Sequence, residues 1–257
     1  MSSDLTLALE LADAADGIAL GRFRAHDLVV ETKPDLSPVT EADRAVEEMI
    51  RGRLADERPG DGVVGEELGV TGGGSRRWIV DPLDGTRNYS RGIPVWATLI
   101  ALQQDGVLRL GVVSAPALGR RWWAERGAGA FADGKPIHVS AVSQVEDAVL
   151  CFALENDLPE LAHRCWHPRA YGDFWAHMLV AEGAADGAID AVGVSVWDLA
   201  AIQPIVEEAG GRFSDRTGVV RVDGGSAVSS NGLLHDALLA APTASPDPNR
   251  ERRTRSA

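Results

Sequence analysis

Two aspartates separated by two residues, Asp81 and Asp84, are the part of the sequence with the clearest potential for chemistry. Residues 78–80 before them are apolar and predict a short buried strand. Pro82 is expected to end the ladder of this strand, because proline cannot donate a backbone hydrogen bond. The chain would then turn and bring Asp84 beside Asp81. Two converging carboxylates and the carbonyl oxygen of Leu83 offer the oxygen ligands that Mg²⁺ prefers.

The next two residues, Gly85 and Thr86, could add an anion site to the same turn. Backbone N–H groups at the start of a helix or tight turn favour a bound phosphate. The segment Asp-Pro-Leu-Asp-Gly is also an ordinary turn sequence, in which Asp and Gly serve local hydrogen bonding and positive φ. Residues 81–86 alone therefore fit two interpretations, a loop that binds metal and phosphate and an ordinary turn without a function.

Acidic residues elsewhere in the chain could complete such a site. Glu66 lies upstream in Gly-Glu-Glu, and Asp198 lies in Trp-Asp-Leu-Ala-Ala, which opens a later predicted helix. A site assembled from three distant segments would require the fold to bring them together.

The order and spacing of these segments resemble the inositol monophosphatase family over nearly the whole chain. The shared segments are residues 65–67, 78–86, 197–201 and the Glu-Ala-Gly-Gly of 208–211. The resemblance implies an α+β fold, a layered αβαβα sandwich of the inositol monophosphatase/fructose-1,6-bisphosphatase type.

The same resemblance implies two or three bound Mg²⁺ ions and hydrolysis of a phosphomonoester by metal-activated water, without a phosphoenzyme. The implied metal ligands are Glu66, Asp81, the Leu83 carbonyl, Asp84 and Asp198. Glu66 and Thr86 would orient the water, and Asp43 matches the family acid that pairs with the threonine. From its helix position alone, Asp43 would be a solvated residue. Lys33 resembles a lysine that reaches over the metals in relatives, at an offset from Asp43 that differs by one residue.

Further segments resemble the histidinol-phosphate phosphatases of actinobacteria. They are residues 33–35, 91–97, 114–117, 121–123, 171–174 and 229–236. Histidinol phosphate carries an ammonium and a titratable imidazole, so its pocket should offer carboxylates and aromatic rings. The substrate-binding candidates are Gly85, Thr86, Asp173, Asp190 and Arg169.

Two of these candidates have alternative interpretations. Asp173 could meet the ammonium, or it could cap a helix that begins at Phe174. Seven residues before Asp198 the family places a substrate-binding glutamate, whereas this chain has Ala191 with Asp190 beside it. Neighbouring side chains on a strand point to opposite faces, so a shift of the strand would be needed for Asp190 to take that role.

Other functions stay open. The leaving group could be inositol, as in inositol 1-phosphate, or another cyclitol, sugar or amino sugar. The chain could also be a non-catalytic subunit that binds a metal or phosphate, but such a protein would be expected to lose a ligand, and none of the five matching side chains is missing.

The pattern of elements predicts two halves and a tail. Residues 1–140 form an N-terminal α+β half with an antiparallel sheet and most metal ligands, 141–241 a C-terminal α/β half with a parallel or mixed sheet, and 242–257 a disordered tail. The expected helices are 1–20, 41–54, 174–182 and 199–209. The expected strands are 28–32, 78–80, 96–103, 108–114, 121–125, 148–154, 187–191 and 212–214. Four arginines in the tail could instead form a nucleic-acid arm.

Composition limits the partners. The formal charge of -13 and the pI of about 4.9 disfavour nucleic acid and anionic membranes, because repulsion would oppose the encounter. The N-terminal segment carries four acidic residues and lacks a secretory apolar region. Two cysteines give no disulfide framework or thiolate zinc site, which fits the cytoplasm. The expected partner is a small phosphorylated metabolite, and the family resemblance implies a homodimer.

Overall fold

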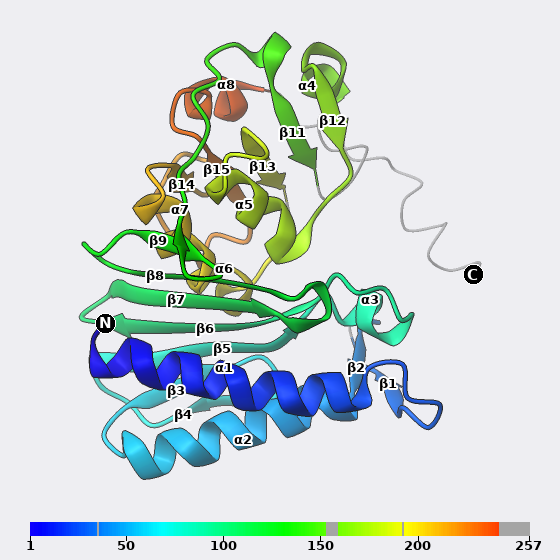
Figure 1. Ribbon diagram of the computed structural model, residues 1–257, viewed down its shortest axis with the longest axis vertical. Coiled ribbons are helices and arrows are strands. Elements are labelled where there is room, and N and C mark those ends of the chain that lie inside the picture. The colour runs from blue at the N-terminus through cyan, green and yellow to red at the C-terminus, as the bar shows by residue number, and fades with distance from the viewer. Residues whose placement is uncertain (35, 153–158, 192, 242–257) are drawn as a thin grey trace.

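Helices and sheets alternate in five layers in the computed structural model (Figure 1), which describes residues 1–34, 36–152, 159–191 and 193–241. Helices α1 (Ser3–Arg22) and α2 (Glu41–Glu57) cover one face of an eight-stranded sheet. Helices α5 (Asp173–Ala181), α6 (Val196–Ala200) and α7 (Ile202–Glu208) fill the layer between that sheet and a five-stranded sheet. Helices α4 (Pro159–Arg164) and α8 (His235–Ala240) lie at the far end. The expected αβαβα sandwich is confirmed.

The eight-stranded sheet has the order β10-β9-β8-β7-β6-β5-β3-β4. Its strands are β3 (Gly62–Gly65), β4 (Gly69–Thr71), β5 (Arg76–Asp84), β6 (Ala97–Gln104), β7 (Val107–Ala115), β8 (Arg120–Glu125), β9 (Ala130–Ala132) and β10 (Lys135–Pro136). All neighbours are antiparallel except β3 and β5, which are parallel. A separate two-stranded ribbon, β1 (Val30–Thr32) with β2 (Pro38–Thr40), leads into α2. Strands β3, β4, β9 and β10 of this sheet, each of at most four residues, were not among the predicted strands.

The five-stranded sheet is mixed, with the order β12-β11-β13-β15-β14. Its strands are β11 (Val149–Phe152), β12 (His167–Arg169), β13 (Gly187–Asp190), β14 (Arg212–Ser214) and β15 (Ala227–Ser230). Strands β12, β11 and β13 are parallel, and β15 is antiparallel to both of its neighbours. The predicted strand at 148–154 reaches Phe152 here, and its last two residues lie outside the described ranges. The predicted tail at 242–257 lies outside them as well.

Local sequence accounts for most helix boundaries. The side chain of Ser2 accepts the N–H of Leu5 at the start of α1, and Thr40 with Asp43 forms a capping box at the start of α2. The single helix expected at 199–209 is in fact α6 and α7, which meet at Ala201. Pro204 lies in the first turn of α7, where a missing N–H costs no helical bond, so the helix restarts just before it. None of the helices within the described ranges has both the length and the apolar character needed to cross a bilayer.

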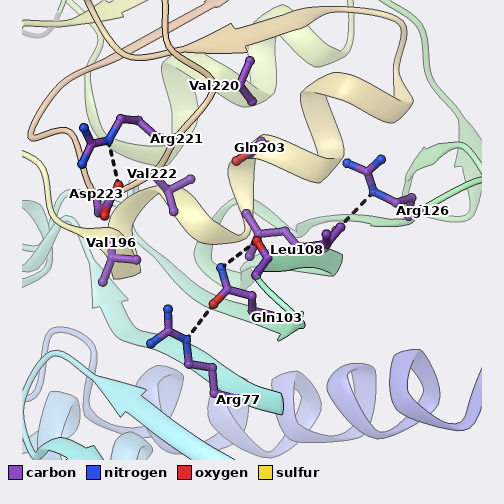
Figure 2. A pocket seen from close by; sticks show the side chains of 12 residues that line it. Arg77, Gln103, Leu108, Arg126, Val196, Gln203, Val220, Arg221, Val222 and Asp223 are labelled. Atoms are coloured by element: carbon purple, nitrogen blue, oxygen red, sulfur yellow. Dashed lines mark hydrogen bonds and ion pairs between the residues drawn. The ribbon is translucent and has the colours of Figure 1, made fainter. Parts of the chain in front are cut away.

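A cavity of about 380 Å³ lies where the start of β5 and the β6–β7 turn meet α7 (Figure 2). Three arginines line it, and each has a partner. Arg77 contacts Gln103 at 2.7 Å, Arg221 contacts Asp223 at 2.8 Å, and Arg126 contacts Glu207 at 3.4 Å. Arg126 and Arg221 are thus paired with carboxylates, whereas Gln103 is a neutral partner and does not compensate the charge of Arg77. The cavity lies at the opposite end of β5 from the paired aspartates.

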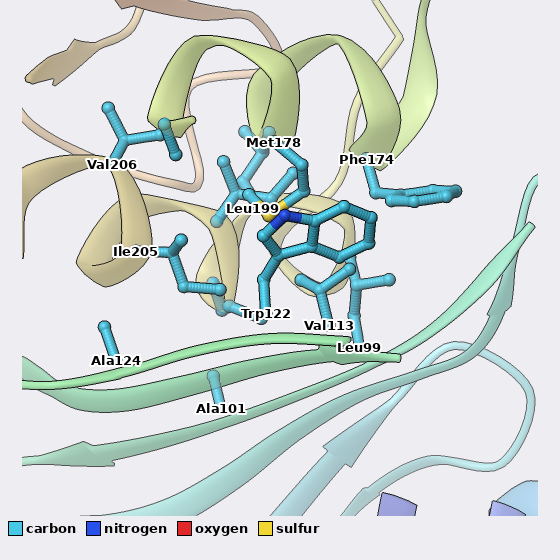
Figure 3. Close-up of a cluster of buried hydrophobic side chains, with 14 of the residues drawn as sticks. Leu99, Ala101, Val113, Trp122, Ala124, Phe174, Met178, Leu199, Ile205 and Val206 are labelled. Atoms are coloured by element: carbon cyan, nitrogen blue, oxygen red, sulfur yellow. The ribbon is translucent and has the colours of Figure 1, made fainter. Parts of the chain in front are cut away.

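Buried side chains lock the middle helices onto the eight-stranded sheet (Figure 3). Trp122 of the sheet is surrounded by residues of all three middle helices, and all of these side chains are at most 1% exposed. They include Phe174, Met178, Leu199, Ile205 and Val206. Burying side chains of this size contributes roughly 1.5–3 kcal/mol each. The packing holds α5 and α6 in a fixed place relative to β5, and so it positions residues that come from different layers.

Candidate active site

A cluster of three carboxylates forms where β5 meets α6. One carboxylate oxygen each from Asp81, Asp84 and Asp198 lies within 4.8 Å of the other two. Asp81 and Asp84 are buried, and Asp198 is half-buried. Sequence segments that are far apart thus meet at one point, in a group that could hold a metal ion.

An irregularity in β5 explains why the two aspartates converge. Asp81 is paired with Leu99 and Asp84 with Ala97, so three steps along β5 correspond to two along β6. In a regular strand, residues three apart face opposite sides, but one extra residue places both on the same side. The prediction that Pro82 ends the strand is wrong, because the ladder shifts register and resumes at Asp84. Within this bulge Thr98 Oγ1 donates to the Pro82 carbonyl at 2.9 Å, which stabilises it.

The electrostatics of the cluster favour a bound cation. Burial raises the pKa of Asp81 and of Asp84 well above the usual value, and neighbouring carboxylates raise both further. Burial likewise raises the pKa of Asp198 to about 6, although hydrogen bonds with the Ser195 N–H and with Asp81 oppose the shift. Like charges held this close in a buried site are unfavourable until a positive charge compensates them. Hard carboxylate oxygens at this spacing fit Mg²⁺.

Glu66 lies just beyond β3 and is not a member of the 4.8 Å group. Its Oε1 accepts a hydrogen bond from Lys33 Nζ at 2.7 Å, and Lys33 also pairs with Glu67 at 2.5 Å. Burial lowers the pKa of Lys33, but the contacts with Glu66 and Glu67 raise it, and the net result is a pKa above the ordinary value. Glu66 is nevertheless close enough to raise the pKa of Asp81 and Asp198.

The loop that carries Glu66 is fixed by Glu47, a residue that the sequence analysis missed. Glu47 is fully buried and accepts the N–H groups of Glu67 at 2.7 Å and Leu68 at 3.1 Å. A Cβ on Gly65 would lie 2.0 Å from Glu47 Oε1, so any larger residue there would displace the Glu47 carboxylate. The available signal was its position four residues after Asp43, which puts both acids on one face of α2.

Thr86 and Asp43 are in direct contact. Thr86 Oγ1 lies 3.0 Å from Asp43 Oδ1 and 2.9 Å from the Leu83 carbonyl oxygen. Asp43 is fully buried and also accepts the Thr40 N–H at 2.9 Å, so it is not the solvated residue that its helix position alone suggested. Burial raises the pKa of Asp43 above its ordinary value, although hydrogen bonds from Thr40 and Thr86 oppose the shift.

Gly85 turns the chain from β5 into helix α3 (Thr86–Ser90). It has φ 83°, and a Cβ there would lie 2.9 Å from the Val95 carbonyl oxygen. Both the left-handed backbone and the close approach of another backbone segment require glycine. The turn places Thr86 directly after the paired aspartates.

Asp173 begins α5 beside the carboxylate cluster. The Phe174 N–H donates to Asp84 Oδ2 at 2.6 Å, which joins α5 to β5. The interpretation of Asp173 as the helix cap is wrong, because the N-cap position is occupied by Gly172. Within the described residues, no side chain forms a capping hydrogen bond at this helix start. Asp173 has φ 54°, an unusual backbone conformation for a residue other than glycine. Burial raises the pKa of Asp173, and the negative charge of the nearby Asp190 raises it further.

The two remaining candidates lie in the five-stranded sheet. Asp190 ends β13 and is directed at α5, where its Oδ2 lies 2.8 Å from His177 Nε2. It is close enough to raise the pKa of Asp84 and Asp198. Arg169 ends β12, two strands away from β13, and no contact within the described ranges joins it to the carboxylate cluster.

Comparison with known proteins shows extensive similarity. Residues 1–246 match the model of the inositol monophosphatase family. The chain is 55% identical to a histidinol-phosphatase of Mycobacterium tuberculosis, over 92% of this chain and 96% of that protein. It is 50% identical to a histidinol-phosphatase of Streptomyces coelicolor, over 92% and 95%. Among solved structures, a Thermotoga maritima IMPase has a TM-score of 0.85 and 30% identity, with 93% of this chain and 96% of that chain covered.

Proposed function

The chain belongs to the inositol monophosphatase family and is a phosphoric monoester hydrolase, and from this premise we propose that it hydrolyses L-histidinol phosphate to L-histidinol and phosphate in histidine biosynthesis. The observation that carries the proposal is that five acids lie near one another, between the carboxylate cluster at β5 and the end of β13. Asp81, Asp84 and Asp198 suit a metal, whereas Asp173 and Asp190 lie further along, where a cationic alcohol would benefit from negative charge. The names of the two bacterial relatives support the same substrate.

We further propose that the cofactor is Mg²⁺, as two or three ions. The residues that would hold them are Glu66, Asp81, Asp84, Asp198 and, through its carbonyl, Leu83. Bound there, the ions would supply a water of lowered pKa and stabilise charge on the phosphoryl and leaving oxygens.

Thr86, Asp43 and Glu66 would orient the attacking water. When the Thr86 hydroxyl donates to Asp43 at 3.0 Å, the threonine oxygen keeps its lone pairs free to accept a hydrogen bond from the water. Glu66 would accept a hydrogen bond from the second O–H of the water. The backbone N–H groups of Gly85 and Thr86, at the start of α3, suit the phosphate oxygens.

The leaving alcohol would lie toward Asp173 and Asp190. These acids raise the pKa of their neighbours because several negative charges share one buried region. An ammonium or imidazolium group would relieve that repulsion, which a neutral cyclitol could not do. The acidic region therefore favours an aminated leaving group over inositol, the principal alternative.

Asp84→Asn tests the catalytic part of the proposal. The change removes one anionic ligand without altering side-chain volume, so Mg²⁺-dependent phosphate release from histidinol phosphate should be lost. Chelation of the metal should abolish the wild-type activity. Asp236→Asn, at an exposed acid of α8, is the matched control and should retain full activity. Full activity of Asp84→Asn, or of the wild type in chelator, would overturn the mechanism.

A second experiment tests the substrate. We expect kcat/KM to be highest for histidinol phosphate when it is compared with inositol 1-phosphate and a nucleoside 3′-phosphate. A higher value for inositol 1-phosphate would assign the cyclitol alternative. Absence of turnover with all three, in folded protein with Mg²⁺, would favour the remote alternative of a non-catalytic binding subunit.

The proposal includes a cytoplasmic homodimer that binds neither nucleic acid nor membranes. Both cysteines, Cys151 and Cys165, are buried and free, which suits a reducing compartment. Light scattering coupled to size-exclusion chromatography should give twice the chain mass of 27.3 kDa. A monomer at assay concentrations would contradict this part alone.

A further inference from the structure

Three buried polar residues form a hydrogen-bonded chain next to the candidate site. His177 Nε2 lies 2.8 Å from Asp190 Oδ2, and His177 Nδ1 lies 2.7 Å from Ser229 Oγ. His177 and Ser229 are fully buried, and Asp190 is 4% exposed. These hydrogen bonds join three elements, because His177 lies in α5, Asp190 in β13 and Ser229 in β15.

The chemistry of the three groups fixes where the protons lie. A carboxylate only accepts hydrogen bonds, so Nε2 must carry a proton that it donates to Asp190. In the neutral imidazole Nδ1 then accepts, and the Ser229 hydroxyl donates to it. Both ring nitrogens of His177 are therefore satisfied, and the ring is held from two sides.

The trio resembles a catalytic triad in composition but differs from one in arrangement. In a triad the serine pairs with one ring nitrogen and is open to substrate. Here Ser229 is fully buried inside the five-stranded sheet, opposite Ala188 of β13. A hydroxyl without access to substrate cannot act as a nucleophile, so the three hydrogen-bonded residues must have another role.

Helix α5 connects this chain to the phosphate end of the site. At its first turn the Phe174 N–H donates to Asp84 at 2.6 Å, and one turn later His177 holds Asp190. Only Oδ2 of Asp190 is engaged by the described residues, which leaves Oδ1 for another partner. Asp190 also lies near enough to Asp173 to raise the pKa of that carboxyl.

We infer that His177 is a positioning residue that orients Asp190 so that its second carboxylate oxygen meets a cationic group on the leaving alcohol. The inference rests on the proposed function, because it assigns the acid and its support within the proposed alcohol pocket. Without His177, the buried Asp190 would lose the hydrogen-bond donor that fixes the orientation of its carboxylate. The enzyme should then lose preference for cationic substrates while keeping its phosphate chemistry.

The test compares His177→Phe with His177→Gln. Phenylalanine fills similar volume without a donor, whereas the glutamine amide can still donate to Asp190. With histidinol phosphate, His177→Phe should raise KM about tenfold or more, as expected for loss of one charge-assisted contact, and change kcat little. With p-nitrophenyl phosphate, which lacks a cation, both constants should match the wild type. His177→Gln should restore most of the affinity, and Ser229→Ala should give a smaller shift in the same direction.

A second substrate pair separates the inference from the proposed substrate. Glucosamine 6-phosphate and glucose 6-phosphate differ in one ammonium, so the ratio of their kcat/KM values reports cation recognition. The ratio should fall in His177→Phe. Equal losses on cationic and neutral substrates, or no rescue by glutamine, would overturn the positioning role. If the wild type fails only on histidinol phosphate, the proposed substrate is wrong, and the ratio for the sugar pair still decides the role of His177.

Discussion

Thr86 has two acceptors for one hydroxyl proton, Asp43 Oδ1 at 3.0 Å and the Leu83 carbonyl at 2.9 Å. Only one can receive that proton at a time. When Asp43 receives it, the Leu83 carbonyl is free to act as the metal ligand that the family resemblance implies. A carbonyl oxygen has two lone pairs, so Leu83 can bind a metal in either case, but donation to Asp43 leaves both pairs available, which gives a role to an acid that is fully buried in α2.

Substitutions of Thr86 test this arrangement. Thr86→Val keeps the shape but removes the hydroxyl, so kcat should fall by roughly 10²–10⁴ if the residue orients the water. Thr86→Ser retains the oxygen and should stay within about tenfold of the wild type. Steady-state phosphate release with excess Mg²⁺ measures both. Equal activity of the valine and serine variants would exclude a role for the hydroxyl.

The junction of β5 and α3 is the element on which the site depends most. The bulge aligns Asp81 with Asp84, and Gly85 then redirects the chain into α3 with no room for a side chain. Glu47 performs a comparable task at the end of β3, where it holds the loop that carries Glu66. Each proposed ligand is thus positioned by backbone geometry or by a buried hydrogen bond.

Gly85→Ala should destabilise the fold more than Gly106→Ala does. Both glycines have positive φ, so both variants incur a strain of roughly 1–2 kcal/mol. Only at Gly85 does the added Cβ meet another atom, the Val95 carbonyl oxygen at 2.9 Å, and overpacking adds about 1–3 kcal/mol. Urea unfolding of the two variants measures the difference. Equal free energies of unfolding would show that the backbone at Val95 moves away from the added Cβ without an energetic cost.

Helix α8 should make stability depend on pH through His235. The ring contacts Ser214 and Ser230 at 2.9 Å each, and burial lowers its pKa from 6.5 to about 4. The unfolded chain therefore binds more protons between these pH values, so this contribution is complete above about pH 6.5 and is lost as the pH falls toward 4. The loss should reach up to about 3 kcal/mol. His235→Gln cannot titrate, so the difference in unfolding free energy between wild type and variant should shrink on acidification, and parallel curves would contradict the assignment.

At the scale of the whole molecule, the proposed site adds local charge repulsion to an acidic chain. The formal charge of -13 already counts the acids Asp81, Asp84 and Asp198, which lie together in one small region. The packed layers keep these groups together at a cost in stability. A bound divalent cation would remove that cost, so binding and folding should be coupled.

Thermal unfolding tests this coupling. Mg²⁺ at about 100 times its dissociation constant should stabilise the wild type by about 2.7 kcal/mol, which corresponds to a rise in Tm of roughly 5–10 °C for a chain of this size. Asp84→Asn should show a smaller rise, and in chelator it should be at least as stable as the wild type because one buried like charge is gone. A Tm that is insensitive to Mg²⁺ in the wild type would contradict a metal site at this cluster.

The sequence by itself indicated the family through motifs in a fixed order and spacing, and the resemblance to that family implied the five-layer fold and the short list of acids. Helices α1, α2 and α5 and strands β5 to β8, β11 and β13 were predicted from periodicity. The short helices α3, α4 and α8 and strands β3, β4, β9, β10, β12 and β15 were not, and α6 and α7 are separated only by the position of Pro204. The division at residue 140 and the catalytic roles stay predictions.

Tertiary structure decided which of those acids meet and what holds them. No local rule predicts that a bulge replaces the expected end of β5 at Pro82, because that shift depends on pairing with β6. Likewise, the roles of Glu47 and His177 follow from contacts between elements distant in sequence. A buried polar residue is identified by its partners, and those partners are set only when the layers pack.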